Sequence, residues 1–456
     1  LGDVYKRQVY ATYQQLNSLY NRLMYMMAEL PTDMMKNGLG MPNANLQDLE
    51  FLRFNSQNTF VKDMWKNCYS GISRANTAIA KIPEIKMNES KKNRLIAEAR
   101  TLRALYYFNL VRFFGDVPLI LDLKTVEDSK GPRDSKELIY DQIIEDLTFA
   151  EEHLPLRSEY SASDEGRINK GAAKILFGKV YLTKGDFQKA KDKLAEVVEH
   201  ESEYGFGLHK DYHANWLRDT EAGIEAVLYI EYKEPPFQHN GEMALAGPKY
   251  SIPGSLGISA LNEADIPTQE LYDQFDNRDL RKKTNFKTEF AHLKTGEILK
   301  SSIPLSGKFW VEGLETGDRC DVNMHIIRYA DAILMYAEAL NEVGKSTKAL
   351  AMLNRIRERA FGDDSGNFKP MSKDEFRTAI LNERRLEFPH EGHRWFDLVR
   401  TGTFIQRMKE HSAYEAKVAE ANKTEIAQNI KEHMILMPIP QSEIDLNPNL
   451  VQNAGY

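Results

Sequence analysis

Two segments of this chain repeat one spacing of small and large residues, and this spacing strongly limits how they can fold. In the first segment, residues 176–198 (LFGKVYLTKGDFQKAKDKLAEVV), the residues at the characteristic positions are Gly178, Tyr181, Ala190 and Leu194. Small residues let two antiparallel helices approach closely, and large residues fill the groove between them. The spacing is typical of tetratricopeptide helical hairpins and predicts a mainly α fold.

The second segment, YAEALNEVGKSTKALAMLNRIR, fits the same frame. Its corresponding residues are Ala337, Leu340, Ala349 and Leu353. Two weaker matches keep only the second helix and a closing proline, namely TAIAKIP with Ala78 and Pro83 and TFAEEHLP with Ala150 and Pro155. We therefore expect four irregular hairpins.

Helical periodicity also covers residues 95–113, before Gly115, and residues 326–340, before Gly344. The first eight residues, LGDVYKRQ, have no such pattern and are interpreted as a remnant outside the fold. No signal peptide is visible there, so any targeting segment of an exported protein is expected to have been removed.

The pattern changes between residues 201 and 322, where glycine and proline are frequent and helical periodicity fades, apart from a short helix expected at 271–275. Alternation predicts a strand in GIEAVLYIEY (223–232) and another in HMILMPIP (433–440). The chain is thus divided into an N-terminal helical part (9–200), a loop-rich insert (201–322) and a C-terminal helical part (323–456). A loop-rich insert on a helical scaffold is the expected ligand region.

Charge and cysteine content exclude several classes of protein. The net charge is −7, and the lysines and arginines are mixed among acids, which argues against nucleic-acid binding. Only Cys68 and Cys320 are present, too few for a disulfide framework or a cysteine metal site. No stretch reaches the roughly 18 apolar residues of a membrane span.

Residues 382–402, NERRLEFPHEGHRWFDLVRTG, concentrate charges, histidines and a tryptophan. His390 and His393 are three residues apart and flanked by Pro389 and Gly392, whereas a helical zinc site needs a spacing of four. We favour a buried ionic knot in which one helix ends before Pro389 and another restarts. The expected pairs at i, i+3 are Arg384 with Glu387 and Arg394 with Asp397.

No nucleophile elbow, phosphate-binding loop or dinucleotide fingerprint occurs in the chain, and no catalytic residue, metal or cofactor is predicted. Aromatic residues of the insert are more suggestive, because a flat ring offers an apolar platform to a sugar. The candidate ligand-binding residues are Tyr212, Trp216, Phe237, Tyr250 and Trp310. The alternative interpretation is that these rings fasten the loops to the scaffold.

Six segments in sequence order resemble the SusD/RagB family. They are WKNCYSGISRANTAIAKIP (65–83), EARTLRALYYFNLVRFFGDVPLI (98–120), KGAAKILFGKVYLTKGDFQKA (170–190), RYADAILMYAEALNE (328–342), NERRLEFPHEGHRWFDLVRTG (382–402) and MPIPQSEIDLNPNLVQNAGY (437–456). The resemblance runs from about Val9 to Tyr456.

This resemblance implies a single SusD-like body over residues 9–456, with four tetratricopeptide-like units and no catalysis. It also implies a lipid-anchored, surface-exposed protein of the outer membrane that captures oligosaccharide and passes it to a SusC-like TonB-dependent transporter. No lipid-bearing cysteine precedes Val9, so the anchor is implied by the resemblance alone. A glycan-acting hydrolase and a helical-repeat scaffold for another protein are the alternatives.

Overall fold

The computed structural model describes residues 2–38, 43–122, 125, 127, 129–233, 242–418 and 425–456, and it is mainly helical. Its contacts divide the chain into two compact units. The first unit comprises Leu1–Leu23, Phe54–Phe206 and Glu432–Tyr456, and the second comprises Met24–Arg53 and Gly207–Lys431. Within the described residues, no helix has both the length and the apolar content that a membrane crossing requires.

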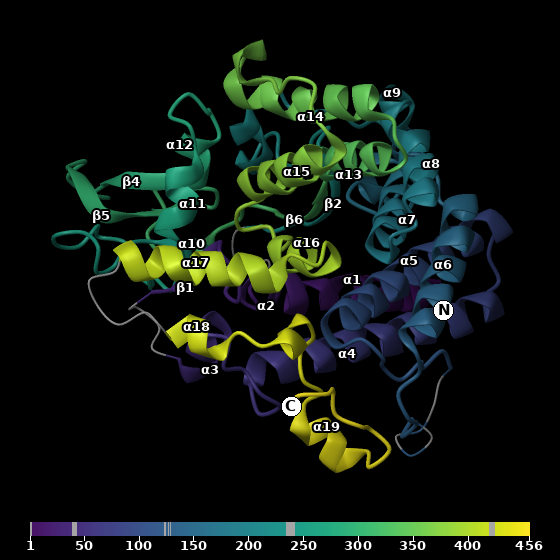
Figure 1. Ribbon diagram of the computed structural model, residues 1–456. Helices are drawn as coiled ribbons and strands as arrows, with labels where there is room; N and C mark the ends of the chain where they lie inside the picture. The colour runs from purple at the N-terminus through teal and green to yellow at the C-terminus, as the bar shows by residue number, and fades with distance from the viewer. Residues whose placement is uncertain are drawn as a thin grey trace. The chain divides into compact units, whose positions relative to one another are not determined.

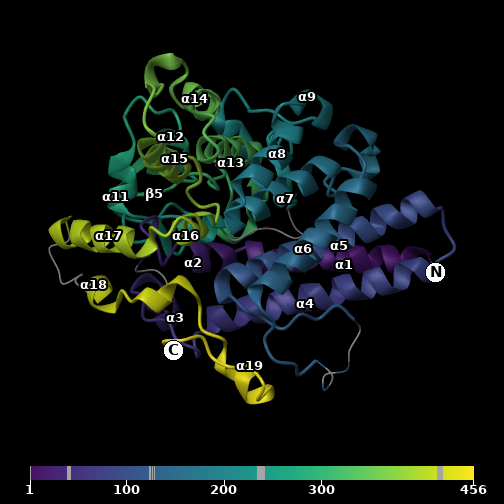
Figure 2. The same cartoon turned by 45° about the vertical axis from the view of Figure 1, so that its right-hand side comes forward.

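The first unit is built from helices. They are α1 (Gly2–Tyr20), α4 (Thr59–Lys81), α5 (Glu89–Phe114), α6 (Lys136–His153), α7 (Lys170–Lys184), α8 (Phe187–Val198), α9 (Glu201–Tyr204) and α19 (Gln441–Leu446). The predicted helix at 95–113 is the buried part of α5, which packs against α1, α4 and α6 (Figure 2). It ends as predicted at Gly115, whose φ of 73° suits a residue without a Cβ.

Helices α7 and α8 form the hairpin that the first repeat-like segment predicts. A Cβ built on Gly178 would lie 2.5 Å from Cγ of Leu194, so only glycine permits this helix separation. Gly185 ends α7 in the left-handed conformation, and the Asp186 side chain then accepts the Lys189 N–H at the start of α8. The packing is consistent with a tetratricopeptide-like unit.

The second unit combines helices with short strands. Its helices are α2 (Leu23–Ala28), α3 (Ala44–Glu50), α10 (Glu242–Ala246), α11 (Gln269–Gln274), α12 (Lys282–Asn285), α13 (Tyr329–Glu342), α14 (Ser346–Phe361), α15 (Lys373–Glu387), α16 (Arg394–Arg400), α17 (Phe404–Val418) and α18 (Glu425–Asn429). Its strands form the antiparallel pairs β1 (Met35–Asn37) with β3 (Asp265–Pro267), β2 (Ala226–Ile230) with β6 (Met324–Arg328), and β4 (Phe286–Ala291) with β5 (Ile298–Ser306).

Helices α13, α14 and α15 lie side by side in the second unit (Figure 1). The residues of the second repeat-like segment lie on α13 and α14, which pack against each other. All four of them are buried, namely Ala337, Leu340, Ala349 and Leu353. Helix α11 and strand β2 fall in the segments where a short helix and a strand are predicted.

Three sequence predictions are wrong in detail. The helix expected from residue 326 begins at Tyr329, because Ile326 and Ile327 belong to β6 and both are buried beside β2. HMILMPIP is no strand: residues Glu432–Ile435 form a 3-10 turn, and Pro438 and Pro440 supply no N–H for a strand ladder. LGDVYKRQ is largely helical, because a helix nucleated over the buried residues from Val9 onward extends at little cost.

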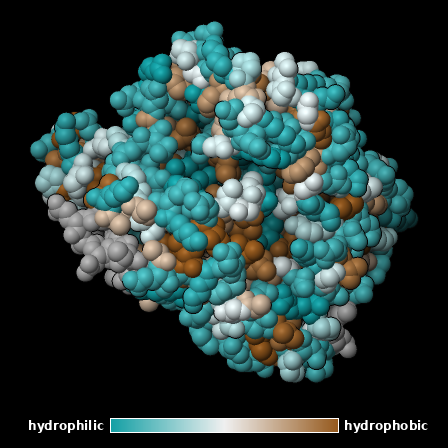
Figure 3. Space-filling model, viewed as in Figure 1, coloured by the Kyte–Doolittle hydropathy of each residue, from teal (hydrophilic) through white to brown (hydrophobic). Residues whose placement is uncertain are grey.

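The surface of the first unit has an apolar patch at its C-terminal segment. Figure 3 shows it in brown where α19 lies, and Leu446 and Val451 there are 66% and 71% exposed. Cys68 of this unit and Cys320 of the second unit are buried free thiols.

We expect Gly178→Val to destabilise the first unit by about 1–3 kcal/mol, because the added methyl groups overpack the contact with Leu194. Urea unfolding followed by circular dichroism measures the loss. Gly131→Val is the matched control, because nothing lies within 4 Å of a Cβ at that position. The loss in Gly178→Val/Leu194→Ala should be smaller than the sum of the single losses; strict additivity would contradict the contact.

Candidate functional site

Two of the predicted ligand-binding rings are buried in the second unit. Tyr212 and Trp216 belong to one 3-10 turn, Tyr212–Trp216, and are 2% and 4% exposed. The Tyr212 hydroxyl donates to the Glu387 carbonyl at 2.7 Å, and Asn285 Oδ1 lies 3.1 Å from the same hydroxyl. In this conformation neither ring offers a face to a ligand.

These rings cover a buried ionic network. Arg328 Cζ lies 5.3 Å from the centre of the Trp216 ring, and Lys308 Nζ lies 4.5 Å from it. A ring face attracts a desolvated cation, so Trp216 stabilises charges that have left water. The burial of Tyr212 and Trp216 is the arrangement that the alternative interpretation expects, and their part in ligand binding stays a prediction.

Glu387, at the end of α15, is the centre of this network. Its carboxylate pairs with Arg281 at 3.0 Å, Arg328 at 3.0 Å and Arg359 at 2.6 Å. Burial raises the pKa of Glu387, but the three guanidinium groups outweigh it and lower the pKa to about 2. Glu387 is therefore a structural carboxylate and no general acid at neutral pH.

Glu391 repeats this arrangement four residues later. It accepts from Arg328 Nε at 2.7 Å and from Lys308 Nζ at 2.6 Å. Burial again acts to raise the pKa of Glu391, and Arg328 and Lys308 lower it to about 2. Lys308 Nζ also donates to the Pro389 carbonyl at 2.6 Å, which fixes the break between α15 and α16.

The ionic knot predicted for residues 382–402 is confirmed, but both predicted pairs are wrong. Arg384 pairs with Asp331 at 2.7 Å and Asp397 at 2.8 Å, whereas Glu387 takes the partners described above. Arg394 binds Asp33 with two hydrogen bonds of 2.8 Å each. The i, i+3 spacing describes one helix only, and these side chains point towards other elements.

The HEGH sequence forms a turn that holds the buried carboxyl group of Glu29. His390, at φ 58°, and Gly392, at φ 70°, curl the backbone so that the N–H groups of residues 390, 391 and 392 donate to Glu29 at 2.6–2.9 Å. Burial raises the pKa of Glu29 to about 8 against the lowering effect of these donors, and burial lowers the pKa of His390 to about 3. Throughout the described ranges, no group of three or more His, Cys, Asp or Glu side chains could hold a metal ion.

Tyr250 is the predicted ring that the structure displays. It is 56% exposed, and the Lys249 ammonium lies 5.4 Å from the ring centre. The backbone N–H groups of Lys249, Tyr250 and Ser251 all donate to Glu263 Oε2, at 2.8, 2.8 and 2.9 Å. Glu263 is buried, so an exposed ring is mounted on a backbone that an interior carboxylate holds.

Trp310 is partly buried and packs against two apolar clusters of the second unit. Its ring meets Phe290 edge to face, with ring centres 4.8 Å apart. Lys287 Nζ lies 5.8 Å from the Trp310 ring centre and pairs with Glu312 at 2.9 Å. Phe237, the fifth predicted residue, lies outside the described residues.

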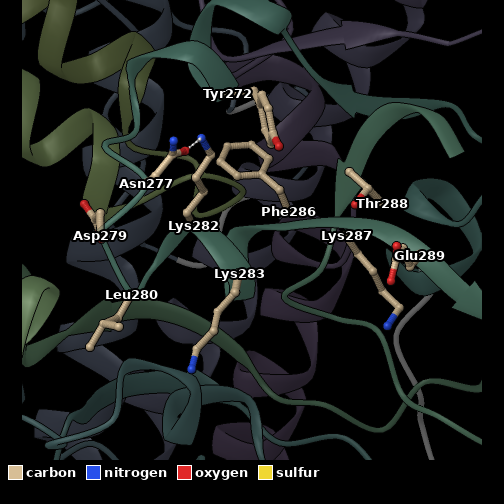
Figure 4. A pocket seen from close by; sticks show the side chains of 10 residues that line it. All are labelled: Tyr272, Asn277, Asp279, Leu280, Lys282, Lys283, Phe286, Lys287, Thr288 and Glu289. Carbon is tan, nitrogen blue, oxygen red and sulfur yellow. Dashed lines mark hydrogen bonds between the residues drawn. The ribbon is translucent and has the colours of Figure 1, made fainter. Parts of the chain in front are cut away.

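Lys287, which lies beside the Trp310 ring, also lines an open pocket that the sequence analysis did not predict. The pocket has a volume of about 400 Å³ and is lined by α11, α12, the turn between them and the start of β4 (Figure 4). Tyr272 and Phe286 meet edge to face in it at 5.1 Å, and three lysines line it: Lys282, Lys283 and Lys287. The run RKKTNFK (281–287) could have indicated this basic segment.

Comparison with known proteins identifies the family of the chain. Residues 301–456 match the SusD family, and residues 6–182 match a family described as starch-binding associating with outer membrane. SusD-like protein P2 of Formosa agariphila is 31% identical over 438 residues, which cover 88% of this chain and 81% of that protein. The chain belongs to the SusD family.

Solved structures agree with this assignment. A SusD superfamily protein from Parabacteroides distasonis is 25% identical, with a TM-score of 0.83 and coverage of 100% of this chain and 99% of that one. A laminarin-binding SusD-like protein is 27% identical, with a TM-score of 0.81 and the same coverages. The mainly helical SusD-like fold implied by the sequence resemblance is thus confirmed.

We expect the second unit to lose stability in acid. Glu387 and Glu391 have pKa values of about 2 in the fold against an ordinary 4.5, so their stabilising effect is full above pH 4.5 and is lost as pH falls towards 2. Glu391→Gln should cost about 3–5 kcal/mol at pH 7, because it leaves a buried cation underpaired, and should flatten this pH dependence.

Urea midpoints from tryptophan fluorescence between pH 3 and pH 7 measure both effects. Glu289→Gln is the control, because the Glu289 pair with Lys300 is exposed on both sides and should contribute little at any pH. An unchanged pH slope in Glu391→Gln would contradict the role given to the network.

We expect Glu263→Ala to release the backbone around Tyr250, because three N–H groups lose their common acceptor. Limited digestion with trypsin should then cut faster after Lys249. Cutting after Lys294, on the exposed turn between β4 and β5, should keep its wild-type rate. Equal acceleration at both sites would indicate general unfolding instead.

Proposed function

We propose that this protein captures oligosaccharide at the cell surface and delivers it to a SusC-like TonB-dependent transporter of the outer membrane. In this proposal the chain forms one SusD-like body over residues 9–456, held to the membrane by an N-terminal lipid anchor. The loop-rich insert, residues 201–322, is the ligand region. Membership of the SusD family supports glycan binding, as does the structural similarity to a laminarin-binding SusD-like protein.

The observation that carries the proposal is the exposed ring of Tyr250 on a backbone that Glu263 holds by hydrogen bonds. Stacking of a sugar costs less conformational entropy when the loop that carries the aromatic ring is already ordered. Glu263 orders this loop by accepting the Tyr250 backbone N–H. Trp310 supplies a second partly accessible ring in the same insert. Flat apolar faces beside polar groups such as Lys249 and Lys287 suit the C–H faces and hydroxyl groups of a sugar.

The acids of the ionic network favour binding over hydrolysis. Glycoside cleavage needs one carboxyl group that keeps its proton near neutral pH and a second that faces the scissile bond. Glu387 and Glu391 are buried, and arginine and lysine partners hold their pKa values low. We therefore propose a non-catalytic protein, against the alternatives of a hydrolase or a scaffold for another protein.

Affinity electrophoresis against a panel of neutral and acidic polysaccharides tests the proposal. Retardation is expected for at least one polysaccharide, without release of reducing ends. Trp310→Ala and Tyr250→Ala should each weaken binding by about 1–3 kcal/mol, because each removes an aromatic platform. Tyr10→Ala is the control: that ring is 46% exposed but lies in the first unit.

Release of reducing ends would replace the proposal with the hydrolase. Normal binding by both ring variants would remove Tyr250 and Trp310 from the site. Retardation by none of the polysaccharides, combined with capture of a purified transporter, would favour the scaffold.

A further inference from the structure

The pocket between α11 and β4 is lined by more basic than acidic residues, although the chain as a whole is acidic. The chain as a whole has a net charge of −7, yet three lysines line this one pocket. Three lysines outnumber the two acids that line it, and one of these acids, Asp279, is buried against Arg281 at 2.7 Å. The pocket surface is therefore basic despite the acidic chain.

The three lysines differ in what holds them. Lys282 turns towards Asn277, and its ammonium donates to Asn277 Oδ1 at 2.9 Å and lies 4.5 Å from the Tyr272 ring centre (Figure 4). Lys283 and Lys287 extend the opposite way in the same view. Lys282 thus helps to shape the pocket, and the other two lysines present charge.

Lys283 of α12 and Lys287 of β4 both line the pocket. Lys283 is exposed, and no carboxylate of the described residues pairs with it. Lys287 pairs with Glu312, whose side chain is 61% exposed, so this pair is open to exchange with another anion.

The position of Lys287 connects this charge to the proposed sugar platform. Its ammonium lies 5.8 Å from the centre of the Trp310 ring. A sugar that stacks on Trp310 would carry a substituent on its edge to within reach of Lys287. A neutral sugar would leave both lysines without a role in binding.

We propose that this pocket binds an anionic group of the ligand, a carboxylate or sulfate ester on an oligosaccharide, through Lys283 and Lys287. The inference rests on the proposed function and names the chemical class of its ligand. Nucleic acid fits less well, because it needs an extended basic surface, whereas here the charge is confined to one pocket of an acidic chain.

Isothermal titration calorimetry with three purified probes tests the inference. The probes are tetragalacturonate for the carboxylate, a κ-carrageenan tetrasaccharide for the sulfate ester, and laminaritetraose as the neutral sugar. At least one anionic probe should bind more tightly than laminaritetraose in 20 mM NaCl. Its affinity should fall in 200 mM NaCl, because salt screens exposed charges.

The variant Lys283→Gln/Lys287→Gln should lower the affinity for that probe about tenfold in 20 mM NaCl, because two exposed ion pairs are lost. Lys294→Gln/Lys369→Gln is the matched control, with the same change in net charge at two exposed lysines outside the pocket. Its affinity should stay within about twofold of the wild type. Both variants should keep the wild-type melting temperature.

Each contrary result has a separate meaning. Equal losses in the two variants would overturn the site, since net charge alone would then explain binding. If neither anionic probe binds while a neutral polysaccharide is retarded in the gels, the anionic inference is wrong and the proposed function stands. If no glycan of any kind binds, both are wrong.

Discussion

The second unit depends on the burial of Glu387 among three guanidinium groups. A charge inside a protein is tolerated only when partners surround it, and here Arg281, Arg328 and Arg359 come from the segment before α12, from β6 and from α14. Since the cost of an unpaired buried charge is several kcal/mol, the three elements must all be in place together. We infer that the need to pair the buried Glu387 carboxylate with all three arginines fixes how α15 packs against its neighbours, more than the amount of apolar surface buried does.

The sequence predicted the parts of the fold that depend on neighbours along the chain. Helical period and the spacing around Gly178 and Leu194 gave the α7–α8 hairpin, because both residues belong to one local motif. The ionic knot was predicted in kind but with the wrong pairs. Arg384 and Glu387 are three residues apart, yet their partners, such as Asp331 and Arg281, lie far away in the sequence. Local spacing carries no information on such partners.

The candidate site was predicted less well, because ring exposure in a segment without periodicity is set by tertiary contacts. Tyr212 and Trp216 were proposed beside Tyr250, but the first two rings cover buried cations and only the third is displayed. The lysine pocket was missed for a related reason. RKKTNFK reads as an ordinary solvated run until α12 and β4 bring its members round one cavity.

Irregular loops in the second unit are made rigid by carboxylates instead of by secondary structure. Glu29 and Glu263 each accept three successive backbone N–H groups, from residues 390–392 and 249–251. Glu29 comes from a segment far away in the sequence, whereas Glu263 lies 12 to 14 residues after its three donors and closes a local loop. The backbone that carries Tyr250 has already lost its conformational entropy during folding, and a ligand need not supply that part of the cost. For the proposed function, a backbone that is already ordered suits capture and release of a sugar, because the loop need not be ordered again when the ligand arrives.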